Sequence, residues 1–409
     1  MRTFCFSSIF QKVSTWIMIQ ELSHRIGQIL ARGIQEKKLY GACAAVFRKQ
    51  ELCYMTTAGF ADQEKQLPMQ PDTLFRMFSM TKPITAAATM MLWEQGKLEL
   101  TDPVSWYIPT FRNQLVDAAG KLVPAERELI LQDLLNMTSG IPYPDCHTLS
   151  QKKMGAFYDE INTRLSTDHP VDTQEFAMRV GKDVPLLFQP GTRWSYGASA
   201  DILGAVLERV SDLPLDELFR KLIFTPLGMK DTDFYVPEEK RPRLAQLYAW
   251  GKNGLQIEPD PHLGMTDYRK RPAFFSGGAG LISTLSDYAQ FANALAGKGL
   301  HKASGTRLFG KGTWRYLTTP QLSPRQKTGI DWPQLKGYTY GNLLRVLENP
   351  AACCTCVPAG EFGWDGWTGP YFCVSPEDQT VLLYLVQVCG GSTSDIVTRL
   401  RNTTFGMLG

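Results

Sequence analysis

Strand-like patterns lie near the two ends of this chain, and helical patterns dominate its middle. Residues 41–60 alternate loosely around Lys49-Gln50-Glu51, which predicts a β-hairpin. Residues 374–388 hold two apolar runs separated by a polar turn, which indicates a second hairpin, and a closing helix is expected over 394–404. A sheet assembled from both chain ends, with a helical insertion, satisfies this order. We therefore predict an α+β fold in which an antiparallel sheet is flanked by helices and joined to a mostly helical second lobe.

The length of 409 residues exceeds what one core usually serves, so two packed lobes are expected. Residues 21–100 are assigned to the first part of an α/β lobe, 101–270 to the mainly helical lobe, and 271–409 to the second part of the α/β lobe. Residues 1–20 form a poorly defined N-terminal extension. Within the helical lobe, 141–170 is polar and irregular and is interpreted as a loop over a surface or a cleft. Helices are predicted over 79–98, 131–137, 173–180, 200–210, 215–223 and 285–296.

A cleaner helix signal begins just after Met18. Apolar residues follow that methionine at helical spacing, at Ile19, Leu22, Ile26, Ile29 and Leu30. We therefore hypothesise that the natural chain starts at Met18. Peptide mapping of the natural protein that recovers residues 2–17 would exclude this hypothesis.

The composition is that of an ordinary globular protein, with 44% hydrophobic and 20% charged residues. The long apolar runs of a membrane span are absent. The net charge is +3 and the basic residues are scattered, which argues against nucleic acid as a partner. The nine cysteines, including the cluster at 353–356, and the five histidines lack zinc-site spacing, so free thiols, no metal and no cofactor are expected. The lack of a clear signal segment predicts a cytoplasmic protein.

Ser79-Met80-Thr81-Lys82 is an S-x-x-K motif. On a helix, residues three apart share a face, so the Lys82 amine is expected near the Ser79 hydroxyl. A serine hydroxyl is a weak nucleophile that needs an adjacent base, and lysine serves as that base only when its pKa is lowered. Burial among apolar side chains lowers the pKa of an amine, and the motif is surrounded by Phe75, Met77, Phe78, Met80 and Ile84.

A second S-x-x-K, Ser150-Gln151-Lys152-Lys153, lies in the polar segment with no apolar helix after it. Its lysine is therefore expected to stay solvated and protonated. Pro83 is tolerated in the first turn of a helix, which places Ser79 near a helix N-terminus, where the helix dipole stabilises negative charge. Ser79 is the predicted nucleophile.

Further segments of the sequence match known motifs, and they occur along the chain in the same order as those motifs. They are 134–142 (LLNMTSGIP), 188–198 (FQPGTRWSYGA), 226–229 (PLGM) followed by Asp231-Thr232, 276–284 (SGGAGLIST) followed by Asp287, and Phe362-Gly363-Trp364-Asp365-Gly366. Together with the S-x-x-K motif, they resemble the serine β-lactamase and penicillin-binding-protein family, in particular the class C β-lactamases and their relatives. The resemblance runs from about residue 40 to 390.

The resemblance implies a role for each matching residue. Ser79 would be acylated, Lys82 and Tyr196 would share proton transfer, and Tyr196 would protonate the leaving group. The backbone N–H groups of Ser79 and Trp367, which follows Gly366 after the third signature, would form the oxyanion hole. The rings expected to line the substrate site are Tyr143, Trp364, Trp367 and Tyr371.

Two departures from the family pattern bear on the substrate. The third signature is usually Lys-Thr-Gly, and its lysine recognises a carboxylate, whereas here the matching position is Trp364, an apolar ring with one donor. The usual Tyr-x-Asn is here Tyr196-Gly197-Ala198. Both changes point away from β-lactams and towards the related family VIII carboxylesterases and acyltransferases. The chain is therefore predicted to be a serine hydrolase for small or medium acyl esters.

Three alternatives stay open from the sequence. A D-amino-acid peptidase would need a cation for the substrate carboxylate, and Arg193 or Arg271 are the candidates. A weak β-lactamase is the second alternative. The third is a non-catalytic binder of a peptidoglycan fragment or small ligand, although such a binder has no need of a buried lysine beside a serine. The oligomeric state is not indicated by the sequence.

Overall fold

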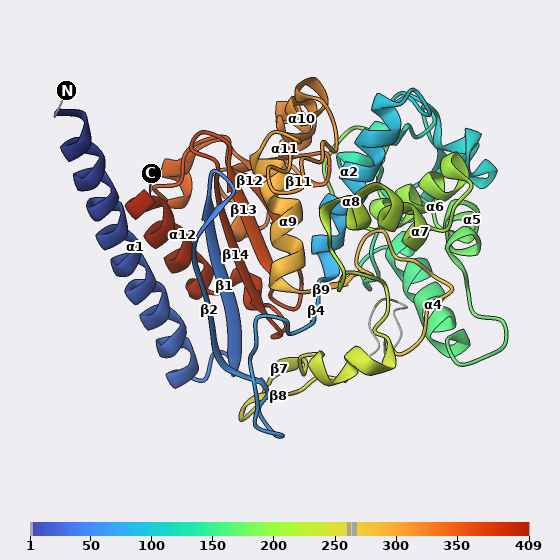
Figure 1. Cartoon of the computed structure of the whole chain (residues 1–409). Coiled ribbons are helices and arrows are strands. Elements are labelled where there is room, and N and C mark those ends of the chain that lie inside the picture. The colour runs from blue at the N-terminus through green and yellow to red at the C-terminus, as the bar shows by residue number, and fades with distance from the viewer. Residues whose placement is uncertain (1–2, 260–262, 264–267, 409) are drawn as a thin grey trace.

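An antiparallel sheet forms the centre of one lobe, and helices cover both of its faces (Figure 1). The computed structural model describes residues 3–259, 263 and 268–408. Helices α1 (Thr3–Gln35) and α12 (Asp395–Leu408) lie on one face of the sheet, and α9 (Leu285–Ala296) packs on the other. A mainly helical lobe stands beside the sheet. The predicted α+β architecture is confirmed.

The two chain ends meet in the middle of the sheet, as predicted. In order across the sheet, its strands are β10 (Tyr338–Gly341), β11 (Leu344–Leu347), β12 (Phe362–Asp365), β13 (Tyr371–Ser375), β14 (Thr380–Val386), β1 (Gly41–Arg48), β2 (Glu51–Asp62) and β3 (Leu67–Pro68). β1 pairs with β14 from Ala42↔Val386 to Arg48↔Thr380. Residues 41–46 of β1 are all buried, because helices cover both faces of the sheet centre.

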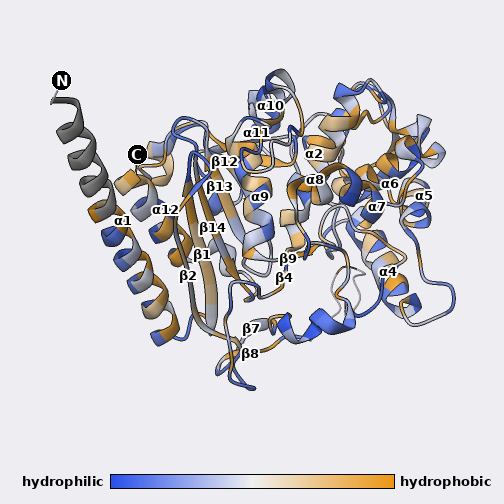
Figure 2. Ribbon diagram, in the orientation of Figure 1, coloured by the Kyte–Doolittle hydropathy of each residue, from blue (hydrophilic) through white to orange (hydrophobic). Residues whose placement is uncertain are grey.

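Both predicted hairpins are present. β1 and β2 are joined at Lys49 and Gln50, whose φ angles of 52° and 65° are those of the hairpin turn that matches strand twist. β13 and β14 are joined across 376–379. In Figure 2, hydrophobic colours gather on the central strands, and α1 carries both hydrophobic and hydrophilic colours.

The N-terminal helix is longer than the sequence pattern predicts. The amphipathic pattern predicts a start near Ile19, whereas α1 begins at Thr3. Leu22, Ile26 and Leu30 are fully buried, so the predicted apolar face is the packed face.

Three two-stranded ribbons and a set of helices complete the fold. The ribbons pair β4 (Phe75–Arg76) with β9 (Ile282–Ser283), β5 (Leu115–Ala118) with β6 (Lys121–Pro124), and β7 (Tyr248–Gly251) with β8 (Gly254–Ile257). The remaining α-helices are α2 (Thr81–Glu94), α3 (Leu131–Leu135), α4 (Leu149–Arg164), α5 (Thr173–Asp183), α6 (Ser199–Ser211), α7 (Leu215–Phe219), α8 (Thr225–Leu227), α10 (Lys311–Thr318) and α11 (Pro324–Lys327).

Helix α4 corrects the prediction of an irregular loop over 141–170. Thr148 and Gln151 form a capping box at its N-terminus. An apolar stripe on its surface is buried, with members three and four residues apart at Met154, Phe157, Tyr158 and Ile161. The stripe is hard to see in the sequence because polar residues fill most of the remaining positions of the helix.

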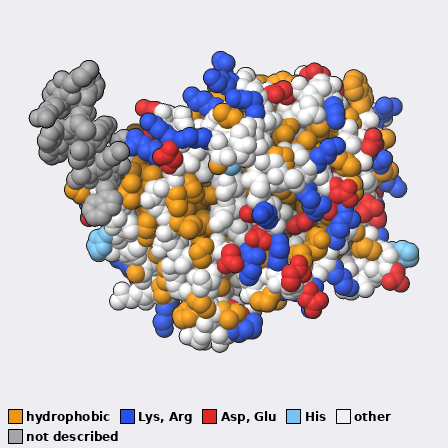
Figure 3. All heavy atoms as spheres, viewed as in Figure 1, with side chains coloured by type: hydrophobic (Ala, Val, Ile, Leu, Met, Phe, Trp, Pro, Cys, Tyr) orange, Lys and Arg blue, Asp and Glu red, His pale blue; other side chains and the backbone are white. Residues whose placement is uncertain are grey.

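The surface of the helical lobe carries both signs of charge. On the face shown in Figure 3, Lys and Arg side chains alternate with Asp and Glu side chains. Many of these charges are paired, as in the contact of Arg179 with Glu160 at 2.8 Å. No helix in the described part of the chain is long and apolar enough to cross a membrane.

Candidate active site

Ser79 lies in a tight turn between β4 and α2. A 3-10 turn, Phe78–Met80, precedes α2, so the α-helix begins at Thr81 rather than at Ser79. Phe78 has a φ of 44°, which is uncommon for a bulky residue and marks local strain. The N–H of Met77 donates to the carbonyl of Leu281 (2.8 Å) and anchors the turn. Ser79 is half-buried just before the N-terminus of α2.

The side chain of Lys82 is fully buried and points at Ser79, the predicted nucleophile. Its Nζ lies 3.2 Å from Ser79 Oγ, as the motif spacing predicts. It also contacts Tyr143 Oη at 3.1 Å and the carbonyl oxygen of Gly278 at 2.8 Å. The structure therefore brings Ser79, Lys82 and Tyr143 together.

Burial lowers the pKa of Lys82 to about 7. The charged form of an amine loses hydration in an apolar environment, which is the main cause of the shift. The carboxylates of Asp201 and Asp365 oppose it by raising the pKa. At neutral pH a large fraction of Lys82 is thus the free amine, which can accept a proton from Ser79.

Tyr196 joins the same cluster from the loop before α6. Its ring centroid lies 4.7 Å from Lys82 Nζ, and its hydroxyl is hydrogen-bonded to Ser79. The indole Nε1–H of Trp364 donates to Tyr196 Oη at 3.1 Å. Burial raises the pKa of Tyr196, while the hydrogen bonds from Ser79 and Trp364 lower it. Tyr196 is therefore protonated at neutral pH and has a donor in place to stabilise its phenolate.

Close backbone packing sets the positions of the two tyrosines. A side chain on Gly197 would lie 1.9 Å from the carbonyl oxygen of Ile141, so the loops that carry Tyr143 and Tyr196 touch through a glycine. Ser139 Oγ is 2.7 Å from Ser199 Oγ at the start of α6. The rings of Tyr143 and Tyr196 lie 5.7 Å apart.

The third signature packs against the nucleophile turn. A side chain on Gly366 would lie 2.3 Å from the carbonyl oxygen of Met77, so only glycine fits there. The next residue, Trp367, places its half-exposed ring 5.4 Å from that of Phe78. This contact brings the backbone of 366–367 beside the turn that holds Ser79. The geometry fits the predicted oxyanion hole, which stays a prediction.

Further aromatic rings surround Tyr196. Trp332 packs edge-on against it at 4.9 Å between ring centroids, and Trp194 lies 6.2 Å away. Tyr340 packs against Trp364 at 5.0 Å. Trp332 and Tyr340 were not singled out by sequence analysis, because neither belongs to a motif and both come from segments more than 130 residues from Tyr196.

Tyr371 does not belong to this cluster. It pairs with Asp365 across β12 and β13, so it shares the sheet face of Asp365 rather than that of Trp364. The guanidinium of Arg345 lies 4.5 Å from its ring centroid. The sequence places Tyr371 near the motif, but the strand alternation turns its side chain to the opposite face.

The two candidate cations for a substrate carboxylate have other partners. Arg271 donates two hydrogen bonds of 2.7 Å to the buried carboxylate of Asp216. The exposed Arg193 lies over the ring of Phe188 at 4.8 Å.

The second S-x-x-K differs from the first in its surroundings. Ser150 is buried, but Lys153 is exposed and donates to the carbonyl of Asp183 at 3.1 Å. It is helical rather than part of a loop, and its lysine faces solvent as predicted.

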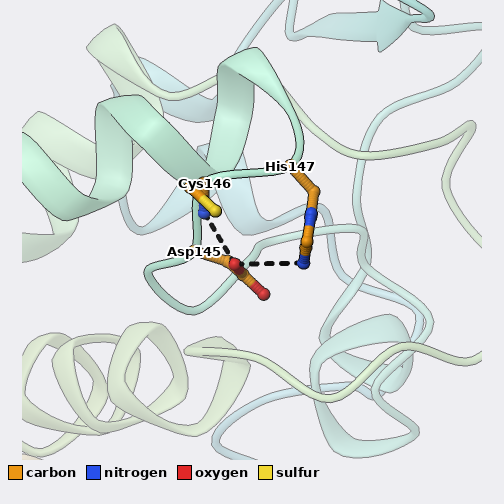
Figure 4. A group of neighbouring side chains, drawn as sticks. All are labelled: Asp145, Cys146 and His147. Carbon is orange, nitrogen blue, oxygen red and sulfur yellow. Dashed lines mark hydrogen bonds and ion pairs between the residues drawn. The ribbon is translucent and has the colours of Figure 1, made fainter.

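One group of potential metal ligands occurs among the described residues. Asp145, Cys146 and His147 are consecutive, exposed and within 4.8 Å of one another (Figure 4). His147 Nε2 lies 3.4 Å from Asp145 Oδ1. The group has no buried ligand, so we assign it no metal.

Comparison with known proteins supports the family that the order of the motifs predicts. The model of the family described as Beta-lactamase matches residues 26–401. Protein Rv1367c of Mycobacterium tuberculosis is 33% identical over 364 residues, which cover 86% of each chain. Esterase EstB of Burkholderia gladioli is 30% identical over 404 residues, covering 94% of this chain and 95% of that one. The solved structure of EstCE1, a hydrolase with promiscuous acyltransferase activity, has a TM-score of 0.81 at 24% identity and covers 95% of this chain and 100% of its own. Because the family match spans nearly the whole length, the protein belongs to the β-lactamase family.

Proposed function

We propose that this protein is a serine hydrolase that cleaves uncharged carboxylic esters through an acyl-enzyme on Ser79. The observation that carries the proposal is the buried Lys82 amine, 3.2 Å from Ser79 Oγ, with a pKa of about 7. An amine in this state is an effective base at neutral pH. A relative of similar length, EstB, is named an esterase, which supports the class of reaction.

The geometry supports a two-step acyl transfer. Lys82 accepts the hydroxyl proton of Ser79 as Oγ attacks the ester carbonyl. The resulting oxyanion would be held by the N–H groups of Ser79 and Trp367. Tyr196 donates its proton to the departing alkoxide, and the alcohol leaves. Water, or a second alcohol, then attacks the acyl-enzyme and gives its proton to the Tyr196 phenolate. As the acyl bond to Oγ breaks, the Lys82 ammonium returns its proton to Ser79, so all three groups regain their starting state.

The lining of the site favours an uncharged substrate. Trp364, at the position where the family usually has lysine, is buried and donates its single N–H to Tyr196. Arg193 and Arg271 contact Phe188 and Asp216 instead of the cluster. Together, these contacts support an esterase over a peptidase or a β-lactamase, whose substrates carry a carboxylate.

The first experiment compares an ester with a penicillin on three proteins. Wild type, Ser79→Ala and Ser150→Ala are mixed with p-nitrophenyl butyrate or a fluorescent penicillin, and turnover and intact mass are measured. We expect ester turnover in wild type and Ser150→Ala, its loss in Ser79→Ala, and little penicillin adduct. Ser150→Ala is the matched control because it alters the other S-x-x-K. A stable penicillin adduct on Ser79 without ester turnover would indicate a penicillin-binding peptidase, and neither signal would indicate a binder.

A further inference from the structure

Asp201 is a buried carboxylate that sits directly behind the catalytic lysine. It lies in the first turn of α6, five residues after Tyr196, and is 1% exposed. Its Oδ1 accepts hydrogen bonds from Ser276 Oγ (2.5 Å) and from the N–H of Gly278 (3.0 Å). Negative charge is stabilised at this end of a helix. None of the motifs described above includes this carboxylate.

The segment that Asp201 holds is the one that contacts Lys82. The carbonyl oxygen of Gly278 accepts from Lys82 Nζ at 2.8 Å. The preceding carbonyl, of Gly277, accepts from Thr85 Oγ1 at 2.6 Å. A side chain on Gly278 would lie 2.8 Å from the Asp201 carboxylate, so the contact requires glycine. Asp201 therefore fixes the peptide group between Gly277 and Gly278, and the carbonyl of the next peptide group, that of Gly278, binds the lysine.

The hydrogen bond from Lys82 to the Gly278 carbonyl sets the orientation of the neutral amine. A neutral lysine amine has two N–H bonds and one lone pair. A carbonyl oxygen only accepts, so one N–H is committed to Gly278. Tyr143 Oη, at 3.1 Å, is available to the second N–H. The lone pair is then left for the hydroxyl proton of Ser79. Loss of the Gly278 contact would let the amine rotate away from Ser79.

We propose that Asp201 is a positioning residue for the proton transfer, and that it acts on Lys82 through the backbone of Gly278, whose N–H it binds and whose carbonyl binds the lysine. The inference rests on the proposed function, since it assigns the device that orients the base of that reaction. When Lys82 takes the proton from Ser79, the nearby carboxylate also stabilises the ammonium ion that forms.

Among the described residues, four charged or titratable groups face Lys82. They are the carboxylates of Asp201 and Asp365 and the phenols of Tyr143 and Tyr196. Burial raises the pKa of Asp201, and the charge of Lys82 and the hydrogen bonds from Ser276 and Gly278 lower it. Asp365 has separate partners, Ser392 Oγ at 2.8 Å and Arg345 Nη1 at 3.5 Å. Asp365 thus acts on Lys82 through charge alone, without touching the Gly278 segment.

The test is the pH dependence of p-nitrophenyl butyrate hydrolysis in wild type and three variants. In wild type, kcat/KM should rise with pH through about 7, because Lys82 must lose its proton to act as a base. Asp201→Asn keeps an acceptor for Gly278 and removes the charge, which lowers the pKa of Lys82. The rise of kcat/KM with pH in this variant should therefore move to lower pH by about one unit, and kcat should stay within about tenfold of the wild-type value. Asp201→Ala removes both effects, so kcat should fall about 100-fold at an unchanged KM.

Asp365→Asn is the control for charge alone. It should move the pH profile in the same direction as Asp201→Asn, and its kcat should fall much less than that of Asp201→Ala. Circular dichroism and thermal unfolding confirm that each variant is folded, and Asp201→Asn alone decides if Asp201→Ala does not fold. Variants of Asp201 with lower thermal stability but the wild-type pH profile and kcat would overturn the inference. An equal loss of kcat in Asp365→Asn and Asp201→Ala would also overturn it. Failure of the proposed function is recognised separately, because wild type and Ser79→Ala would then hydrolyse the ester equally.

Discussion

At the scale of single residues, the site depends on keeping a lysine neutral inside the protein. Lys82 is fully buried, and Ser79 Oγ, Tyr143 Oη and the carbonyl oxygen of Gly278 lie within hydrogen-bond distance of its Nζ. Desolvation of this amine opposes folding and, by lowering its pKa, creates the base. In the proposed reaction Tyr196 is the complementary group, since burial raises its pKa and keeps it protonated, as the donor to a leaving alkoxide must be. The same buried environment thus lowers the pKa of Lys82, the proposed base, and raises the pKa of Tyr196, the proposed acid.

A leaving-group comparison tests the role of Tyr196 and of its partner Trp364. An alkoxide must be protonated to leave, whereas p-nitrophenolate is a weak enough base to leave unprotonated. Tyr196→Phe should therefore reduce turnover of ethyl butyrate much more than that of p-nitrophenyl butyrate. Trp364→Phe removes the N–H that stabilises the phenolate and should reduce kcat for the ethyl ester about 10- to 100-fold. Equal losses on both esters would show that Tyr196 does not act as the acid.

At the scale of elements, the site is assembled by backbones that touch through glycine. Gly366, after β12, meets the carbonyl of Met77, and Gly197, before α6, meets that of Ile141. The first contact brings the end of β12 to the turn before α2, and the second brings the segment before α6 to the loop that carries Tyr143. Side chains larger than hydrogen at these points would separate the elements that carry the reacting groups.

Replacement of Gly366 tests the contribution of this contact to catalysis. In Gly366→Ala, the new methyl group would lie 2.3 Å from the Met77 oxygen, so the β12 turn must move and carry the Trp367 N–H with it. We expect kcat to fall about 100- to 1,000-fold, as for loss of an oxyanion donor. Gly312→Ala is the control, since Gly312 has open space around it and no left-handed φ, and it should keep full activity. Wild-type kcat in folded Gly366→Ala would exclude the predicted oxyanion hole.

At the scale of the whole molecule, a buried ionic network ties the C-terminal helix to the sheet. Glu361, before β12, is fully buried and lies 3.5 Å from Arg345 on β11 and from Arg401 on α12. The hydroxyl of Tyr338 on β10 donates to Glu361 at 2.9 Å. The network thus links two strands, the segment before a third strand, and a helix that is distant in sequence. The network lies on the face of the sheet opposite to Trp364. On the same face as the network, Asp365 also contacts Arg345.

Neutralising Glu361 should therefore weaken the whole fold. Glu361→Gln leaves two buried guanidinium groups without their shared carboxylate, and the free energy of unfolding should fall by about 3–5 kcal/mol. The control is Glu348→Gln, because Glu348 forms a partly exposed pair with Lys327 at 2.6 Å. That change should cost less than about 1 kcal/mol. Urea denaturation of the three proteins measures both values, and similar midpoints for the two variants would contradict the expectation.

Much of this molecule could be predicted from local sequence. The order of patterns predicted the sheet built from both chain ends, and the motif order predicted the family. The spacing of Ser79 and Lys82 predicted their contact, because three residues at the start of a helix are placed by backbone geometry alone. Trp364 was recognised as the departure that makes the site apolar.

The rest was decided by tertiary structure. Asp201 and Gly278 meet Lys82 across 119 and 196 residues of chain, and no spacing rule reaches that far. Helix α4 formed where the sequence indicated a loop, because its stripe is buried by neighbours that the segment itself does not reveal. Tyr371 lies outside the predicted site because side chains alternate along a strand, which places its ring on the other face of the sheet. Local sequence therefore determined which residues could react, and packing determined which groups surround them, since burial and distance exist only once the chain has folded.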